Sequence, residues 1–442
     1  YVRFIYDLNG NPFYSPDLEI EVICPTVTIT DTIDIELGVN SEYIENDSLQ
    51  LTGAMFGEED AEILRVVQGG APLSVTEGVI EGISSGEYAW TVYNSAGYAW
   101  EANVVLATLI ISDAGELDVM SLILQASVLE EETVIATYTH RIYHGYFILD
   151  RNIDYSGQKY DSPIGVRESN INNGFVGVFD GRGYTITNIV FERVNDTDNR
   201  HVKSGLFGAV GYGGMVKNLS ITEVHLTNTW AATFGIALFG KIENVHVEIV
   251  DFAASASGIA MYAYASHSDG TQTVNAGAEM YDSSVRMNLS AAVTGGSEGG
   301  GFFLRVNGDG YAGKFVNNYF INEQVTYTNG WGNTANSLLK DKLEATGNLN
   351  YILPDMKQLT AQTYEGGNTP VLISLEGAVF SDETEIILFD GNRIVDYTLN
   401  TAEDNTEILL DAAVFKGVEN GNHELLILYG GVGYSVELTV NV

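Results

Sequence analysis

The chain has 442 residues, and its 59 Asp and Glu against 20 Lys and Arg give a formal net charge of −39. This charge disfavours binding to nucleic acids, where affinity comes from neutralised phosphates, and to anionic membrane surfaces. Hydrophobic residues still make up 45% of the sequence, which predicts two to four folded domains rather than a disordered polyanion. No run of about 18 apolar residues occurs, so we expect no membrane insertion.

Residues 1–108 consist of short segments that alternate apolar and polar side chains, such as "TVTITDTIDIEL". In "SGEYAWTVYNSAGYAWEANVVL", residues 85–106, two such segments flank a turn at residues 94–97 that contains Asn and Gly. Asn and Gly favour the positive φ of hairpin turns. The pattern predicts a β-sandwich, and Gly86 followed by Tyr88 resembles the last hairpin of bacterial immunoglobulin-like modules.

A different pattern starts at residue 109 and continues to about residue 365. It opens on "ISDAGELDVMSLILQA", in which Asp113 and Glu116 have the spacing of a capping box. Leu117, Met120 and Leu124 then fall on one helical face. We expect this helix to cover the open end of a repeat array, as terminal caps do. A second helix is predicted at residues 335–345.

The central segment repeats itself after this helix. "GMVKNLSITEV" begins at Gly214, "GKIENVHVEIV" at Gly240 and "GKFVNNYFINEQV" at Gly313. Each copy has an Asn four residues after its Gly, at Asn218, Asn244 and Asn317, and looser copies place Asn188 and Asp282 near this position. Repeats of one strand-turn-strand unit predict a solenoid.

The repeats are best explained by a right-handed parallel β-helix. Alternate residues such as Leu219 and Ile221 point inward, while Ser220 and Thr222 point outward. One coil cannot bury its inner face alone, so the coils must stack. Asn tolerates a left-handed backbone and its amides can form a ladder between coils. This structural role is favoured over ligand binding for the repeated Asn residues.

Five motifs in this region, in order, resemble the GLUG-motif β-helices of bacterial surface proteins. They are the "ISDAGEL" helix start, "GYFILDRNIDYSG" at residues 145–157, Pro163 to Gly165, "FVGVFDGRGYTITN" at residues 175–188, and "GLFG" at residues 205–208. The resemblance implies a parallel β-helix with a helical cap. Within it, Asp180 and Gly181 reverse the chain, and Gly183 lets the next strand approach closely.

Residues 366–442 return to the pattern of the first segment. "TEIILFDGNRIVDYTL" reads as a hairpin with residues 390–392 at its tip, and the last two strands surround Gly430 and Gly431. We therefore predict a second immunoglobulin-like sandwich. The sequence predicts an all-β protein with domains at residues 1–108, 109–365 and 366–442.

Many parallel β-helices are polysaccharide lyases or hydrolases, which need clustered carboxylates on one outer face. The candidates here are Glu223, Glu248 and Asp251, but no basic residue falls clearly on their face. A solvated polar face is therefore favoured over catalysis. Zinc, P-loop and nucleophile-elbow motifs are absent from the sequence, so we expect no cofactor, although the acidic turns at residues 7–11 and 193–200 leave Ca²⁺ open.

Long insertions between the repeats carry aromatic residues that could stack on sugar rings or protein partners. The candidate ligand-binding residues are Tyr262, Tyr264, Tyr311 and Trp331.

These observations favour a secreted or cell-surface structural protein with an adhesin-like role. Its partner would be a glycan or a host or cell-surface protein. Two alternatives stay open: a carbohydrate-active β-helix enzyme, and a self-assembling subunit of an extracellular array, filament or phage appendage.

Overall fold

A computed structural model of the chain describes most of its residues, in two compact units, 1–107 and 108–442. The described residues are 5–8, 11–14, 28–38, 44–45, 48–127, 133–135, 138–140, 145–160, 163, 174–192, 194–195, 202–227, 231–253, 256–264, 267–268, 273–274, 277–289, 302–307, 314–322, 349–352, 354–376, 378–380, 385–402 and 405–442. Within these ranges the chain is mostly β, with one α-helix. The predicted helix at residues 335–345 lies outside them. Across the described part of the chain, no helix is both long and apolar enough to cross a membrane.

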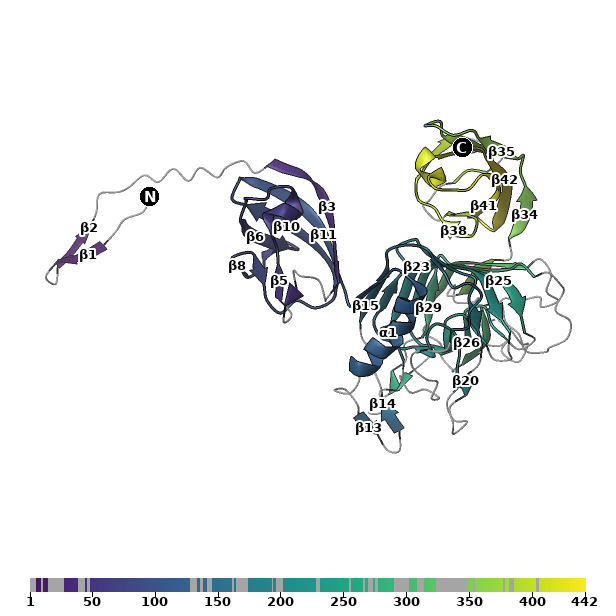
Figure 1. Ribbon diagram of the computed structural model, residues 1–442, viewed down its shortest axis with the longest axis horizontal. Helices are drawn as coiled ribbons and strands as arrows, with labels where there is room; N and C mark the ends of the chain where they lie inside the picture. Colours follow the sequence, from purple (N-terminus) through teal and green to yellow (C-terminus); the bar gives the residue numbers. More distant parts are fainter. Residues whose placement is uncertain are drawn as a thin grey trace. The chain divides into compact units, whose positions relative to one another are not determined.

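The first unit contains two small sheets that pack on a shared core (Figure 1). One sheet has the order β3 (Thr28–Gly38), β11 (Tyr98–Ala107), β10 (Gly86–Asn94), β6 (Ile63–Gln68) and β7 (Ala71–Pro72). The other has the order β4 (Ile44–Glu45), β5 (Ser48–Gln50), β9 (Val79–Ile80) and β8 (Val75–Thr76). β1 (Ile5–Leu8) and β2 (Asn11–Tyr14) form a separate hairpin. The predicted turn at residues 94–97 joins β10 to β11, with Gly97 at φ 87°.

The second unit begins with β12 (Leu109–Ile111) and α1 (Ala114–Ser127). The predicted capping box forms in part: the Glu116 amide donates to Asp113 Oδ1 at 2.9 Å, but Glu116 Oε2 accepts at 2.6 Å from the amide of Ser112, one residue before Asp113. Leu117 and Met120 are fully buried in the central core. The apolar face of α1 therefore packs on the strands that follow it, whereas the side chain of Leu124 is outside the described set.

Parallel pairing between successive segments of the chain builds the main sheet of this unit. Its order is β12, β15 (Tyr146–Leu149), β17 (Val178–Asp180), β23 (Met215–Leu226), β25 (Lys241–Phe252), β29 (Glu279–Tyr281) and β32 (Phe315–Asn322). The strands β16 (Ile153–Asp154), β18 (Thr185–Thr187), β19 (Val190–Phe191), β30 (Ser284–Met287) and β33 (Leu349–Ile352) extend it in parallel. We call this extended sheet the ladder sheet. In its register, residues at equivalent positions of successive repeats are paired, for example Leu219 with Val245.

A second parallel sheet packs on the inner face of the ladder sheet. It consists of β22 (Ala209–Val210), β24 (Gly235–Leu238), β26 (Ala260–Tyr264) and β31 (Phe303–Asn307). Three short antiparallel hairpins interrupt the repeats: β13 (Thr133–Ile135) with β14 (Tyr138–His140), β20 (Val194–Asn195) with β21 (Val202–Lys203), and β27 (His267–Ser268) with β28 (Thr273–Val274).

The core between the two parallel sheets is a column of side chains from equivalent positions. Each member lies beside the next in register and all are fully buried: Phe147, Phe179, Val216, Ile242, Met280 and Phe315. Stacking therefore removes from water an inner face that a single repeat would leave exposed, as the sequence predicts.

The residues at the repeated Asn position have a left-handed backbone, and four of them, Asn218, Asn244, Asp282 and Asn317, form side-chain hydrogen bonds between repeats. Their φ values are 56° at Asn188, 51° at Asn218, 52° at Asn244, 47° at Asp282 and 53° at Asn317. Asn244 Nδ2 donates to Asn218 Oδ1 at 3.0 Å, Asn218 Nδ2 donates to Asp180 Oδ1 at 3.0 Å, and Asn317 Nδ2 donates to Asp282 Oδ1 at 2.8 Å. A carboxylate or amide oxygen of one repeat thus accepts from the amide of the next.

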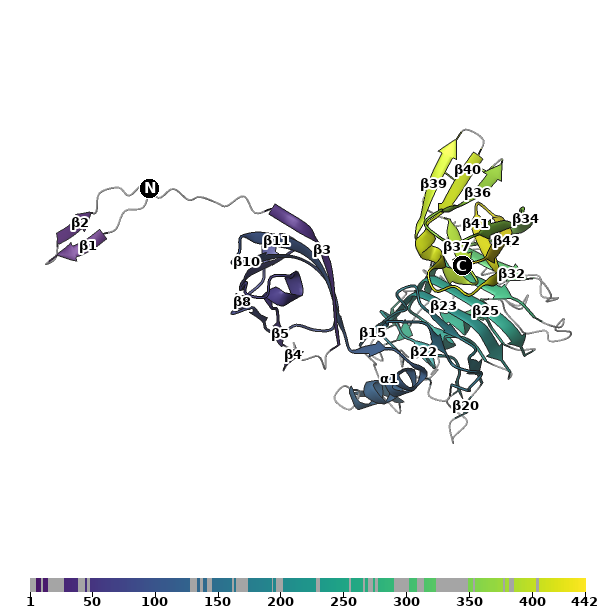
Figure 2. The ribbon, with the colours of Figure 1, turned by 45° about the horizontal axis from the view of Figure 1, so that its top comes forward.

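A C-terminal sandwich completes the second unit. One of its sheets has the order β34 (Asp355–Gln358), β42 (Val432–Val440), β41 (Gly421–Tyr429), β37 (Ile386–Phe389) and β38 (Asn392–Arg393), with β35 (Gln362–Tyr364) also paired to β42. The other is β36 (Val371–Glu376), β40 (Asn405–Leu410) and β39 (Tyr397–Ala402). Because β34 and β35 pair with β42, the sandwich starts about ten residues before the predicted boundary at residue 366. Figure 2 shows its β41 beside β32 of the ladder sheet, and side chains of the two strands share one buried cluster.

Candidate functional site

The three predicted carboxylates lie on β23 and β25, on the outer face of the ladder sheet. Glu223 is exposed and has φ 50° at a bulge, where two residues of β23 lie opposite Glu248 alone. Glu248 is half-buried and accepts a hydrogen bond from Asn288 Nδ2 at 2.8 Å. Asp251 is exposed and its carboxylate lies 4.0 Å from His225 Nδ1. Glu223 and Glu248 are thus brought to neighbouring strands, while Asp251 lies farther along β25 beside His225.

Part of this outer face is not the solvated polar surface that the sequence predicts. Ser220 is 1% exposed, Thr222 8% and His246 2%. The C-terminal sandwich covers this part of the face: a Cβ added to Gly391, at the tip of the β37–β38 hairpin, would lie 2.9 Å from Thr222 Cγ2 and 3.8 Å from Glu248 Oε2. The expectation of a solvated face is therefore wrong around these residues, because the last segment of the chain packs on it.

The sandwich is held there by a strip of apolar side chains. Along β41, Leu425 and Ile427 point into the core of the sandwich, whereas Leu426 and Leu428 point the other way. This is the two-residue period of a strand. The outward set joins a separate buried cluster with side chains of β32 and β37: Tyr319, Ile321, Ile386, Leu388, Leu426 and Leu428. Every member is at most 4% exposed, so the contact excludes water.

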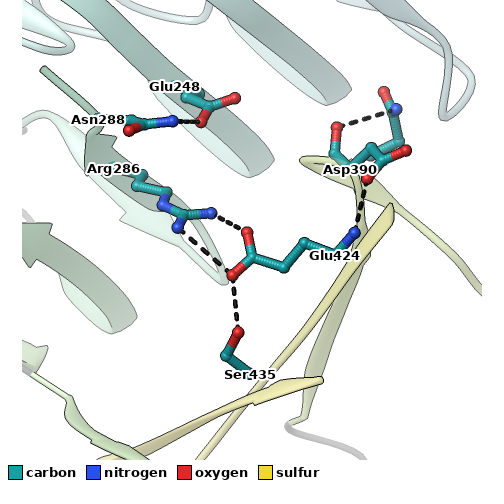
Figure 3. Close-up of polar contacts among 7 residues, drawn as sticks. Glu248, Arg286, Asn288, Asp390, Glu424 and Ser435 are labelled. Atoms are coloured by element: carbon teal, nitrogen blue, oxygen red, sulfur yellow. Dashed lines mark hydrogen bonds and ion pairs between the residues drawn. The ribbon is translucent and has the colours of Figure 1, made fainter. Parts of the chain in front are cut away.

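An ion pair lies at the edge of this apolar strip (Figure 3). Arg286 on β30 contacts both carboxylate oxygens of Glu424 on β41, and Ser435 Oγ donates to Glu424 Oε1 at 2.7 Å. Burial opposes ionisation of Glu424, but the hydrogen bond and charge of Arg286 outweigh it and lower the pKa of the carboxyl. Asp390, in the turn of the β37–β38 hairpin, ties this hairpin to β41, because its Oδ1 accepts a hydrogen bond from the Glu424 amide at 2.9 Å.

Arg286 was missed by the sequence analysis, although the repeat contained the signal. Asp282 occupies the Asn position of its copy, and Arg286 follows it by four residues, as Glu248 follows Asn244. The register indeed places Arg286 beside Glu248. The cavity between Glu248, Arg286, Glu424 and the apolar strip is about 20 Å³, room for about one water molecule. This cavity is too small to hold a sugar ring against Glu248.

A larger polar cleft lies beside this contact, along the row of left-handed Asn and Asp residues of the repeats. It has a volume of about 370 Å³ and we call it the ladder cleft. One wall comes from the repeats and the other from the hairpin of the sandwich; the lining residues are Met215, Lys217, Asn218, Glu243, Asn244, Asp282, Glu385 and Arg393.

The wall from the sandwich contains two charged side chains with incomplete hydrogen bonding. Glu385 is 4% exposed; its Oε1 accepts from the Tyr397 hydroxyl at 2.9 Å, while its Oε2 has no hydrogen-bond partner among the described residues. Arg393 Nη2 donates to the Glu385 carbonyl oxygen at 2.7 Å, but within the same set Nε and Nη1 have none. Burial lowers the pKa of Arg393 and raises that of Tyr397 to about 12.

His246 is buried next to Asn244, one of the residues that line the cleft, and has a structural role. Its Nδ1 is 3.0 Å from Ser284 Oγ and its Nε2 is 3.2 Å from Asn244 Oδ1. Burial, together with the positive charge of Arg393, lowers the pKa of the imidazole well below its usual value. His246 is therefore neutral at pH 7 and connects the Asn ladder to the next repeat.

Of the four predicted ligand-binding aromatics, Tyr264 is the one whose side chain the structure describes. Tyr264 is 3% exposed and stacks on Phe239 with ring centroids 4.5 Å apart, so its ring is a core side chain instead. Tyr262 belongs to β26, but its side chain is outside the described set, as are Tyr311 and Trp331 entirely. The described residues also contain no group of three or more His, Cys, Asp and Glu that could hold a metal ion.

Comparison with known proteins gives one partial relationship. The chain is 41% identical over 81 residues to a protein of Evansella cellulosilytica named "Putative Gly-rich membrane protein". The match covers 17% of this chain and 9% of the length of that protein. No family model matches the chain, and no solved structure matches it.

Proposed function

We propose that residues 108–354 form a right-handed parallel β-helix of the GLUG-motif type, capped by α1 and flanked by two immunoglobulin-like sandwiches. The whole would be a secreted or cell-surface protein with an adhesin-like, non-catalytic role that binds a glycan or a protein partner. The parallel register, the buried column and the Asn ladders support the fold. The partial similarity to a protein named as a membrane protein is in keeping with a place at the cell surface.

The observation that carries the functional proposal is the covered outer face. A glycoside hydrolase needs two carboxylates about 5–9.5 Å apart with space for a sugar between them. Here the hairpin tip at Gly391 lies against Thr222 and Glu248, and Asn288 already bonds Glu248. Arg286, the cation nearest to Glu248 in register, is paired with Glu424. Arg286 therefore serves to attach the sandwich rather than to assist catalysis, which favours a rigid binding scaffold over an enzyme.

The proposal is tested by presenting the purified full chain to an array of glycans and to extracts of cell-surface proteins. We expect saturable binding to a glycan or to a defined protein, and no release of reducing or unsaturated sugar from polysaccharide substrates. Turnover of a polysaccharide that Glu248→Gln abolishes would overturn it. Light scattering with and without Ca²⁺ provides a further check, because growth into large assemblies would point to an array subunit instead.

A further inference from the structure

His423, near the start of β41, has a hydrogen-bond acceptor at each of its two ring nitrogens. Nδ1 lies 2.6 Å from Asp390 Oδ2, and Nε2 lies 2.9 Å from the backbone carbonyl oxygen of Glu419. A carbonyl oxygen only accepts, so Nε2 carries a hydrogen. A second hydrogen is needed between Nδ1 and the carboxyl. The geometry therefore requires one proton more than a neutral imidazole and a carboxylate hold together.

That proton belongs to the imidazole of His423, because the usual pKa of His, about 6.5, is well above that of an Asp carboxyl, about 3.9. Burial opposes the charge, since the side chain of His423 is 15% exposed. The hydrogen bonds to Asp390 and Glu419 and the charge of Asp390 outweigh this burial and raise the pKa of the imidazole. An imidazolium, which donates at both nitrogens, is the form that fits this site.

The charges on the surrounding elements agree with this protonation state. The hairpin tip contributes Asp390, the connection before β41 contributes Lys416 and Glu419, and β41 and β42 contribute the paired Glu424 and Glu437. Lys416 and Glu437 are exposed, and Glu424 is paired with Arg286. Leu438 lies opposite His423 itself, and the ring of Phe389 stacks on the imidazole with centroids 5.3 Å apart. Asp390 and the Glu419 carbonyl are thus the groups that hold the proton.

Asp390 matters because it lies in the turn of the hairpin that covers the ladder sheet. The next residue, Gly391, approaches Thr222 and Glu248. Asp390 has φ 48°, in the left-handed region that costs an L-residue free energy unless its surroundings hold it. Its carboxylate has two such supports, the Glu424 amide (Figure 3) and His423. The conformation of the hairpin tip therefore depends on the state of His423.

We propose that His423 is a proton-dependent clamp, which joins the hairpin tip to the connection before β41 and loosens the cover over Thr222 and Glu248 when it loses its proton. A neutral imidazole has one N–H, so it can donate to Asp390 or to Glu419 but not to both. Its bond to the carboxylate also loses one of the two charges that strengthen it. Because the pKa of His423 is raised by folding, this stabilisation is complete below pH 6.5 and is lost as the pH rises through the higher folded value.

The proton is followed by NMR titration of the full chain carrying 15N-labelled histidine, with the His423 signals assigned by their absence in His423→Gln. We expect a titration midpoint above pH 6.5. Asp390→Asn keeps an oxygen for the Glu424 amide and tolerates the left-handed backbone, yet it should lower this midpoint by about one pH unit or more. Asp251→Asn, which removes the carboxylate 4.0 Å from His225, is the matched control and should leave it unchanged. A midpoint at or below pH 6.5 in the parent chain would overturn the inference.

The cover is tested by the rate at which a disulfide reagent labels a Thr222→Cys variant in a Cys24→Ser background. The forms with and without His423→Gln are compared at the same pH, so the ionisation of the thiol cancels. We expect the form with His423→Gln to react several-fold faster at about pH 6, and both forms to react alike at about pH 9, where His423 has lost its proton. Thermal unfolding checks that each variant is folded, and Asp390→Asn replaces His423→Gln if the latter is not. A ratio of rates that stays constant with pH would overturn the clamp even where His423 titrates as expected.

Discussion

Replacing Leu426 by Ala should separate the C-terminal sandwich from the ladder sheet without unfolding either. Leu426 is 3% exposed and belongs to the apolar strip with Tyr319 and Ile321. Truncation of a buried Leu to Ala costs about 2–5 kcal/mol. If about 3 kcal/mol of this is lost from the contact, the equilibrium constant for opening rises on the order of 100-fold, because 1.4 kcal/mol corresponds to tenfold.

The opening can be followed by the reactivity of a thiol placed beneath the hairpin. Thr222 is 8% exposed and adjacent to Gly391, so a Thr222→Cys substitution in a Cys24→Ser background reports whether the hairpin has lifted. We expect the rate of labelling with a disulfide reagent to rise on the order of 100-fold when Leu426→Ala is added, in proportion to the population of the open state.

Leu425→Ala is the matched control for this experiment. Leu425 precedes Leu426 on the same strand and is equally buried, but it points into the core of the sandwich. It should lower the free energy of unfolding by a similar amount, yet leave thiol labelling in native conditions far slower than Leu426→Ala does. Equal labelling rates in the two variants would refute the idea that the apolar strip fastens the sandwich.

Three further predictions concern the ladder, the close approach of the repeats and pH. Asn244→Ala should be less stable than Asn244→Gly by about 1–2 kcal/mol in denaturant unfolding, since Gly, unlike Ala, adopts the φ of 52° without strain. Gly177→Ala should abolish the cooperative unfolding transition, because an added Cβ would overlap the Gly145 carbonyl oxygen; Gly183→Ala, at φ 81° with open space around it, should cost only about 1–2 kcal/mol. His246 binds a proton in the unfolded chain below pH 6.5 but not in the folded protein, so its contribution to the free energy of unfolding is present above pH 6.5 and falls by about 1.4 kcal/mol per pH unit towards pH 5. Subtracting the pH profile of His246→Gln isolates this slope, and identical profiles for the two proteins would contradict it.

The repeats could be recognised in the sequence because each copy meets the same local backbone requirement. A left-handed backbone after a short strand favours Asn or Asp, and the spacing from Gly214 to Asn218 is the same as from Gly240 to Asn244. The Gly residues that precede the strands let neighbouring backbones approach where a Cβ would clash. These are local constraints, so composition and spacing express them directly.

The covered face could not be read from the repeats, because it depends on a segment about 140 residues away. The alternation of Ser220, Leu219 and Ile221 predicts one buried and one solvated face, and nothing local says that another domain covers the second. The sequence pattern that indicates this covering is found in β37 and β41 of the sandwich instead. "LLILY" and "IILF" are continuous apolar runs, which are typical of strands buried on both sides, whereas a free sandwich has strands with one polar face.

This doubly buried character also explains why Arg286 and Glu424 are paired at the edge of the contact. Undocked, Leu426 and Leu428 would form an exposed apolar stripe on β41, together with Leu388 on β37, and such a stripe promotes aggregation. Docking removes this stripe from water but also brings Glu424 out of bulk solvent, and the lowered pKa of Glu424 indicates that Arg286 more than offsets the burial. The stability from this carboxyl is present above its usual pKa of 4.5 and is lost as the pH falls through its lower value in the folded protein. Between neutral pH and that point the ion pair of Arg286 and Glu424 therefore keeps contributing to the attachment of the sandwich.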